Sequence, residues 1–159
     1  MAHEVFSPEW LAQWAALINS DESLGQRAPV GVWRIYLRAE GDGASPYVPA
    51  GETMHLMLHL SDGRCTRLER TGAPPGPREL DFRFSGPASV FEEVAAGLRD
   101  PVDAGLQGDI KIAGDMTFLL RHAELVKEIV DLYVGRLETD WPRGRPPYGD
   151  PPSRGAGGA

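Results

Sequence analysis

The stretch LQGDIKIAGDMTFLLRHAELV, residues 106–126, places a short apolar run between two glycine–aspartate pairs, ahead of a long helical pattern. The pairs are Gly108-Asp109 and Gly114-Asp115, and the run between them, IKIA, has the length of a single short strand. Glycine at both ends lets such a strand enter and leave a sheet sharply. Asp115 lies where an N-cap residue would begin a helix at Met116. The stretch therefore predicts a short strand followed directly by a helix that continues for most of the way to Leu137.

The same stretch does not fit a phosphate-binding loop. Such a loop needs lysine and a hydroxyl residue directly after its second glycine. Here Asp115 follows Gly114, and a carboxylate at that position would repel a phosphate. A dinucleotide-binding fingerprint is also absent, because no Gly-x-Gly-x-x-Gly follows a predicted strand. We therefore expect no nucleotide site here.

The rest of the chain predicts one α+β domain over residues 6–137. An apolar stripe at helical spacing follows Ser7 and Pro8, which suit a helix cap and a first helical position. Alternating residues over 30–40 predict a strand with one buried face, and Asp62-Gly63 predicts the turn of a hairpin. A further strand and helix are expected over 80–86 and 87–100. The expected fold is a mostly antiparallel five-stranded sheet covered by helices on one face.

Residues 138–159 differ in composition from the domain. They are rich in proline, glycine and arginine and offer little to bury, which is typical of a disordered tail. The segment PRGRPPYGDPP within it could present a polyproline II stretch to an unknown protein partner. The oligomeric state stays open, with a homodimer as one alternative.

Composition excludes several classes of protein. A net charge of −7 disfavours nucleic-acid binding, which requires a basic face. No apolar run reaches the length of about 18 residues that a membrane span needs, so no stable membrane insertion is expected. The first ten residues lack the basic and apolar segments of a signal peptide, which predicts a cytoplasmic protein.

Metal sites and cofactors are not expected. Cys65 is the single cysteine, which rules out an internal disulfide and a cysteine-based zinc site. His55 and His59 share one strand face but lie about 13 Å apart, too far to bind one ion. They are expected to face away from the core. His122 is expected at the surface, near a junction between helices.

The motif at residues 108–116, Gly-Asp-Ile-Lys-Ile-Ala-Gly-Asp-Met, resembles a signature of the sterol carrier protein 2 family. The segment AAGLRDPVDAGLQG is similar to the family's approach to that strand. The segment RELDFRFSGPASVFEEV resembles the family's preceding strand and helix, and MHLMLHLSDGRCTRLER resembles its earlier strands. The first helical segment, FSPEWLAQWAALINSDE, resembles that of stand-alone bacterial members. The resemblance covers residues 6–135 and implies a sheet covered by helices, with an apolar tunnel for a lipid or a similar ligand between them.

Large and flexible apolar side chains are numerous enough to line such a tunnel. The candidate ligand-binding residues are Trp10, Trp14, Trp33, Met54, Leu56, Leu58, Phe82, Phe84, Phe91, Val94, Leu98, Leu106, Ile110, Ile112, Met116, Leu119 and Leu120. The alternative for each is a place in a filled core. Access for a ligand would require movement of the Met116–Leu137 helix or of the Gly41–Gly51 loop.

The expected function is non-catalytic binding or transfer of a fatty acid, acyl-CoA, sterol or similar lipid. The alternative is a small enzyme or biosynthetic accessory protein that acts on a hydrophobic metabolite in the same cavity. No residue is assigned a catalytic role, and the alternative rests on His55, His59 and the aspartates Asp103, Asp109 and Asp115. The two functions differ in whether a histidine or an aspartate lines the cavity. A protein-interaction module would instead have a filled core.

Overall fold

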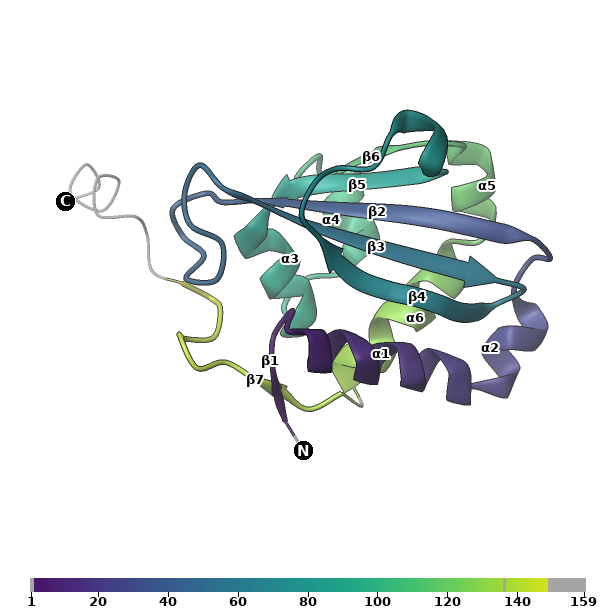
Figure 1. Ribbon diagram of the computed structural model, residues 1–159, viewed down its shortest axis with the longest axis horizontal. Coiled ribbons are helices and arrows are strands. Elements are labelled where there is room, and N and C mark those ends of the chain that lie inside the picture. The colour runs from purple at the N-terminus through teal and green to yellow at the C-terminus, as the bar shows by residue number, and fades with distance from the viewer. Residues whose placement is uncertain (1, 136, 149–159) are drawn as a thin grey trace.

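The computed structural model describes residues 2–135 and 137–148. Its centre is a five-stranded sheet of order β4-β3-β2-β5-β6, shown in Figure 1. The strands of this sheet are β2 (Val32–Glu40), β3 (Thr53–Ser61), β4 (Arg64–Thr71), β5 (Phe82–Pro87) and β6 (Lys111–Ala113). Only β2 and β5 pair in parallel, and the other three pairs are antiparallel. The predicted α+β fold with a mostly antiparallel sheet is confirmed.

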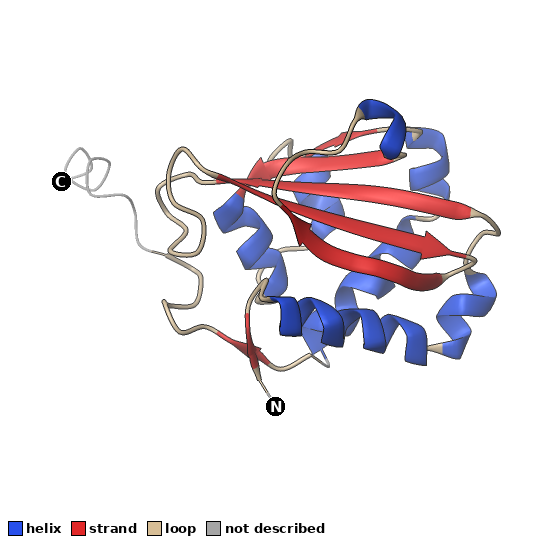
Figure 2. Ribbon diagram, in the orientation of Figure 1, coloured by secondary structure: helices blue, strands red, loops and turns tan. Residues whose placement is uncertain are grey.

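Helices cover one face of this sheet (Figure 2). They are α1 (Pro8–Ser20), α2 (Glu22–Arg27), α3 (Ala88–Ala95), α4 (Pro101–Leu106), α5 (Met116–Arg121) and α6 (Ala123–Gly135). The connection from β4 to β5 crosses the opposite face and contains the 3-10 turn η1 (Pro77–Glu79). Arg34 holds this connection down, since its guanidinium donates to the Arg78 carbonyl oxygen at 3.1 Å and pairs with Asp81. The helices and the β4–β5 connection therefore lie on opposite faces of the sheet.

The elements at the amino-terminal half form where the residue pattern predicts them. Ser7 Oγ accepts a hydrogen bond from the Trp10 amide at 3.2 Å and caps α1. Asp62 and Gly63 have φ values of 50° and 83°, which is the geometry of the tight turn that matches the twist of a hairpin. In β2 every second residue points toward the helices, so that a single apolar set enters the core.

The glycine–aspartate stretch forms the predicted strand and helix start. β6 occupies Lys111–Ala113, and Asp115 Oδ1 accepts from the Phe118 amide at 3.0 Å as an N-cap. Gly114 has φ +135° and lies against Phe82, so this position cannot easily carry a side chain. The long helix is interrupted at His122, whose amide is shared between the carbonyl oxygens of Phe118 and Leu119. The expected helical segment therefore consists of two helices, α5 and α6, with the expected junction near His122.

Two short helices were not predicted. Helix α2 lies in the polar segment after α1, where Asp21 Oδ1 accepts from the Leu24 amide at 2.9 Å. Helix α4 lies between α3 and β6. Each spans six residues, which is too short for an apolar period to show in the sequence. Both nevertheless contribute to the interior, because Leu24 of α2 and Ala104 of α4 are buried.

Residues 137–148, called the C-terminal strap here, pack against the domain rather than extending from it. The strap contributes β7 (Thr139–Asp140), which pairs in parallel with β1 (His3–Glu4). Its contacts are the bond from Trp10 Nε1 to Thr139 Oγ1 at 2.9 Å, the bond from Tyr47 Oη to the Gly144 carbonyl oxygen at 2.9 Å, and the Tyr47–Trp141 ring contact. The prediction of a disordered tail is therefore wrong for residues 138–148. Composition alone misses these particular side-chain contacts, and residues 149–159 lie outside the described part of the chain.

A buried carboxyl group joins the strap, the Gly41–Gly51 loop and α3. Glu92 is 0% exposed, and it accepts hydrogen bonds of 2.5 Å from Ser45 Oγ and from Tyr148 Oη. Ser45 Oγ in turn accepts from the amides of Tyr47 and Val48, each at 3.1 Å. Burial raises the pKa of the Glu92 carboxyl above its ordinary value of 4.5, and the two hydroxyl donors offset this effect only in part.

The raised pKa of Glu92 predicts a stability that falls as pH rises. The folded state holds the proton more tightly than the unfolded state, so the contribution is complete below about pH 4.5 and is lost through the higher folded pKa. Glu92→Gln removes the titration and keeps the shape. We expect the unfolding free energy of this variant, relative to the natural chain, to increase between pH 4 and pH 8 in urea titrations. The exposed Glu124→Gln is the control, and an equal difference at both pH values would contradict the assignment.

Candidate functional site

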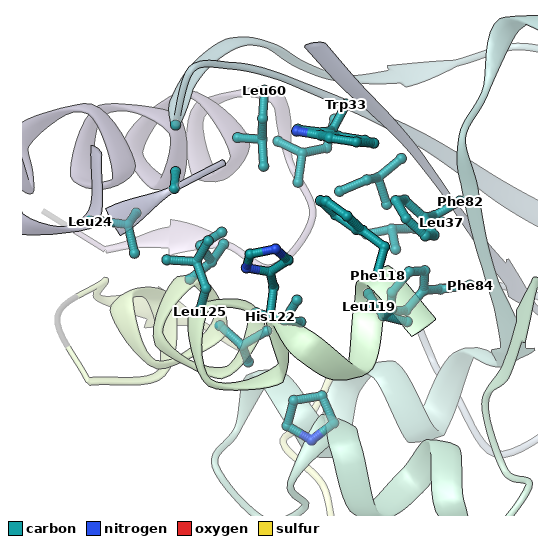
Figure 3. A pocket seen from close by; sticks show the side chains of 18 of the residues that line it. Leu24, Trp33, Leu37, Leu60, Phe82, Phe84, Phe118, Leu119, His122 and Leu125 are labelled. Carbon is teal, nitrogen blue, oxygen red and sulfur yellow. The ribbon is translucent and has the colours of Figure 1, made fainter. Parts of the chain in front are cut away.

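An apolar cavity of about 140 Å³ lies between the sheet and the helices. Its wall combines residues from all six helices described above, from β2, β3 and β5, and from the connections between these elements (Figure 3). The lining residues are Trp14, Leu24, Ala28, Pro29, Trp33, Ile35, Leu37, Leu58, Leu60, Gly63, Phe82, Phe84, Phe91, Val94, Pro101, Ile110, Phe118, Leu119, His122, Leu125, Val126, Ile129 and Val130. Apolar cavities of about 150 Å³ stay dry and accept small apolar molecules. The core of this domain is therefore incompletely filled.

Simple periodicities bring these side chains to the cavity. Trp33, Ile35 and Leu37 alternate along β2 and point to the same face. In α6 the lining residues Leu125, Val126, Ile129 and Val130 recur at helical spacing. The indole N–H of Trp14 donates to the Ile129 carbonyl oxygen at 3.1 Å and links α1 to α6 at the wall. Sheet and helices thus enclose one space from opposite sides.

A second, more open groove of about 380 Å³ adjoins the cavity. Five residues line both hollows: Phe84, Pro101, Ile110, Leu119 and Val126. The groove is bordered on the outside by large apolar side chains that remain accessible to solvent, with Leu106 76% and Leu120 61% exposed. Because these side chains line both hollows, their displacement would join the two.

His122 is the single titratable side chain on the cavity wall of the described residues. It lies at the junction of α5 and α6, with its ring centroid 4.6 Å from that of Phe118. The helix junction expected near His122 is present. The side chain is partly exposed and its ring also lines the cavity, which the sequence did not indicate.

The other histidines lie away from the cavity. His55 and His59 belong to the sheet face opposite the helices, as predicted, and His55 Nδ1 shares a hydrogen bond of 2.5 Å with the Tyr36 hydroxyl. Burial, together with the nearby Arg38 guanidinium, lowers the pKa of His55. Burial also lowers the pKa of His59, with further contributions from Arg67 and Arg34. Neither ring can contact a molecule in the cavity.

The acidic residues weighed for catalysis also lie outside the cavity. Asp115 caps α5, Asp109 pairs with Arg99, and Asp103 is exposed on α4. Among the described residues no group of three or more histidine, cysteine, aspartate or glutamate side chains could hold a metal ion. The geometry thus provides an apolar binding space with one imidazole and no metal centre.

A family model describes residues 29–127, more than half of the chain, as the SCP-2 sterol transfer family. The chain belongs to this family. The matched segment begins just before β2 and ends within α6, so it includes the whole central sheet and most of the cavity wall. The resemblance inferred from the motif at residues 108–116 is confirmed.

Solved structures share the SCP-2 fold with this chain at low sequence identity. A crystal structure of sterol carrier protein 2 has a TM-score of 0.70 and 19% identity, and the match covers 83% of this chain and 98% of that one. A solution structure of a conserved hypothetical protein from Thermus thermophilus has a TM-score of 0.71 and 19% identity. The match covers 89% of this chain and 95% of that one. No curated protein sequence matches the chain. At this identity the structural matches show the fold.

The candidate residues for an SCP-2 ligand fall into three groups. Those that line the cavity are Trp14, Trp33, Leu58, Phe82, Phe84, Phe91, Val94, Ile110 and Leu119. Those that line the groove alone are Leu106, Ile112, Met116 and Leu120. The remaining four line neither hollow: Trp10, Met54 and Leu56 are core residues, and Leu98 is 49% exposed.

Sequence reasoning missed part of the SCP-2 cavity wall. Leu24, Ala28 and Pro29 come from α2 and the connection after it, and the polar composition of this segment gave no reason to place them inside. Ile35 and Leu37 share the alternation that selects Trp33, so the pattern could have found them. The apolar spacing of α6 would likewise have identified Leu125 and Ile129.

Proposed function

We propose that this chain binds a hydrophobic ligand in the cavity between sheet and helices and transfers it without chemical change. The ligand class is a fatty acid, an acyl-CoA, a sterol or a similar lipid. The observation that carries the proposal is an apolar, incompletely filled space in a member of the SCP-2 sterol transfer family. Side chains that line an empty space lose van der Waals contacts on that side, and a bound apolar chain would restore those contacts.

Burial of apolar surface is sufficient to account for tight binding. Each buried methylene group contributes about 0.8 kcal/mol, so a chain of several carbons needs no charged anchor. The adjoining groove extends the apolar path beyond the cavity through Phe84 and Leu119. A long ligand would therefore occupy both hollows once these shared side chains move.

Helix α5 is the better supported of the two access routes. Leu119 of α5 borders both cavity and groove, and the helix has only six residues between two breaks. The Gly41–Gly51 loop, in contrast, is tied to α3 by the Ser45–Glu92 hydrogen bond. We expect faster amide hydrogen exchange in α5 than in the Ser45 segment and protection of α5 on ligand binding. Equal protection of α5 and the sheet, with and without ligand, would contradict this route.

A second candidate function is an enzyme or biosynthetic accessory that uses the same cavity. The observation that favours it is His122, since imidazole is the commonest general base. No aspartate, glutamate, cysteine or serine of the described residues joins it on the cavity wall. A base without a nucleophile or an orienting carboxylate supports binding better than turnover.

Location and partners are also proposals. No helix of the described residues is long and apolar enough to cross a membrane. The net charge of −7 supports a protein that does not bind nucleic acid. A cytoplasmic location, a homodimer and a protein partner for the residues after the domain remain predictions.

A transfer assay tests the proposed function. The full chain is titrated with an anthroyloxy-labelled fatty acid, and its ability to move that lipid between phosphatidylcholine vesicles is measured. We expect saturable binding of one lipid per chain, competition by unlabelled fatty acid or sterol, and transfer faster than spontaneous exchange. Absence of saturable binding for fatty acid, acyl-CoA and sterol probes would contradict the proposal.

A further inference from the structure

Two polar groups on the cavity wall have no hydrogen-bond partner in the described part of the chain. The Trp33 Nε1 atom is shielded from solvent, and no acceptor lies within hydrogen-bond distance of it. The His122 ring makes no hydrogen bond within residues 2–135 and 137–148, and its ring contact with Phe118 is apolar in character. Every other side chain on the wall is apolar or, for Trp14, already bonded. Among the described residues the cavity wall thus carries one buried N–H group without a partner, that of Trp33, and one partly exposed imidazole without a hydrogen bond, that of His122.

The two groups come from opposite walls of the cavity, and Phe118 contacts both. Trp33 projects from β2 and His122 from the junction of α5 and α6, and both rings pack against Phe118. The Trp33 and Phe118 ring centroids are 4.1 Å apart, and those of Phe118 and His122 are 4.6 Å apart. Figure 3 shows the Trp33 indole and the His122 imidazole facing the same open space.

Unsatisfied buried polar groups are rare in folded proteins because they lose their hydrogen bonds to water and gain none. At a binding site, such groups are commonly satisfied by the ligand. The indole N–H can only donate, so its partner must supply an acceptor atom. An imidazole can bond to the same acceptor or to a neighbouring hydroxyl. An oxygen atom therefore matches both groups, whereas a protonated amine has no acceptor to offer Trp33.

We propose that Trp33 and His122 form a polar anchor that selects ligands with one oxygen-bearing head group, either a carboxylate or a hydroxyl. The head group lies beside Phe118, in the open space that both rings face. The apolar part of the ligand extends toward Phe91 and Ile110, where the wall carries no polar side chain. This inference rests on the proposed function and adds to it the chemistry of the ligand head and the orientation of the ligand in the cavity.

Ligands of equal chain length test the anchor without any variant. Decanoic acid, 1-decanol, decylamine and decane, the last delivered from cyclodextrin, compete for the full chain against diphenylhexatriene, a fluorescent probe with no polar group. We expect the acid, the alcohol or both to displace the probe at concentrations at least about fivefold lower than decane and decylamine require, from hydrogen-bond contributions of ordinary size. Tighter binding of only the acid identifies a carboxylate head, and of only the alcohol a hydroxyl head.

Variants then assign the preference to the two residues. Trp33→Phe and His122→Phe keep an aromatic ring and remove the polar atoms, and each is expected to weaken the preferred ligand about three- to tenfold while leaving decane unchanged. Trp141→Phe and His59→Phe make the same replacements outside the cavity and serve as matched controls. Circular dichroism and thermal melting confirm that each variant folds. Since the two anchor variants are independent, either can test the inference if the other does not fold.

The outcomes separate the anchor from the proposed function. If all four ligands displace the probe equally well, or if the anchor variants weaken decane as much as the acid and alcohol, the cavity binds ligands but the anchor is wrong. If neither the probe nor any ligand binds, the proposed function itself fails. A preference for an oxygen head that both anchor variants abolish supports the inference.

Discussion

Replacement of Gly114 by alanine is expected to lower the free energy of unfolding by about 3 kcal/mol or more, among the largest effects of a single substitution. A Cβ atom at this position would lie 2.5 Å from Phe82 Cδ1 and 2.6 Å from the Asp81 carbonyl oxygen. The second contact is with backbone, which cannot rotate away. Gly114 also has φ +135°, a conformation that alanine rarely adopts. Urea denaturation followed by circular dichroism measures the loss.

Gly108→Ala is the matched control for this prediction. Gly108 begins the same segment and also has a positive φ, +82°, but a Cβ atom there would contact nothing within 4 Å. Its replacement should therefore cost only the backbone term of about 1–2 kcal/mol. Equal losses for the two variants would show that the close approach of Gly114 to β5 does not contribute. The two glycines of the motif at residues 108–116 would then be required only by the geometry of the turns.

Val126→Phe is expected to weaken ligand binding about 50-fold while the chain stays folded. Val126 borders both the cavity and the groove, so a phenyl ring there narrows the cavity and obstructs the passage between the two. Displacement of about three methylene groups of a bound chain would cost about 2.4 kcal/mol of binding free energy. Overpacking is limited because the side chain enters empty space, so stability should change by about 1 kcal/mol at most. Competition binding and urea denaturation measure the two effects separately.

Val32→Phe provides the control for the cavity-filling variant. Val32 is 59% exposed at the start of β2 and lines neither hollow, so the same replacement there should leave affinity unchanged. If Val126→Phe binds lipid as tightly as the natural chain, the ligand occupies another part of the molecule. An equal loss in both variants would point to a general effect of the added ring on folding.

The sequence identified the fold through features that are local. Alternation in β2, the Asp62-Gly63 turn and the Asp115 cap each depend on a few neighbouring residues, and each is present in the structure. The strap between Leu137 and Tyr148 could not be predicted in this way. Its order comes from contacts such as Tyr148 with Glu92, which are 56 residues apart in the chain.

The site was predictable only where a residue's face could be read from periodicity. Trp33 and Phe82 were placed on the inner face of the sheet and do line the cavity. Trp10 and Leu56 were equally good candidates by residue type, yet they pack fully into the core, since side-chain type does not reveal where packing leaves a gap. His122 shows the converse, because a helix junction was expected beside it, but only the tertiary structure shows that its ring lines the cavity.

The proposed function requires that the cavity holds a hydrophobic molecule. Native mass spectrometry of the full chain, purified without detergent and followed by organic extraction of the released material, tests this most directly. We expect a mass increment of one small molecule per chain, and the extracted compound should combine an apolar chain or ring system with a single oxygen-bearing head group. A chain that carries no extra mass, and that takes up no fatty acid, acyl-CoA or sterol on incubation, would contradict the account.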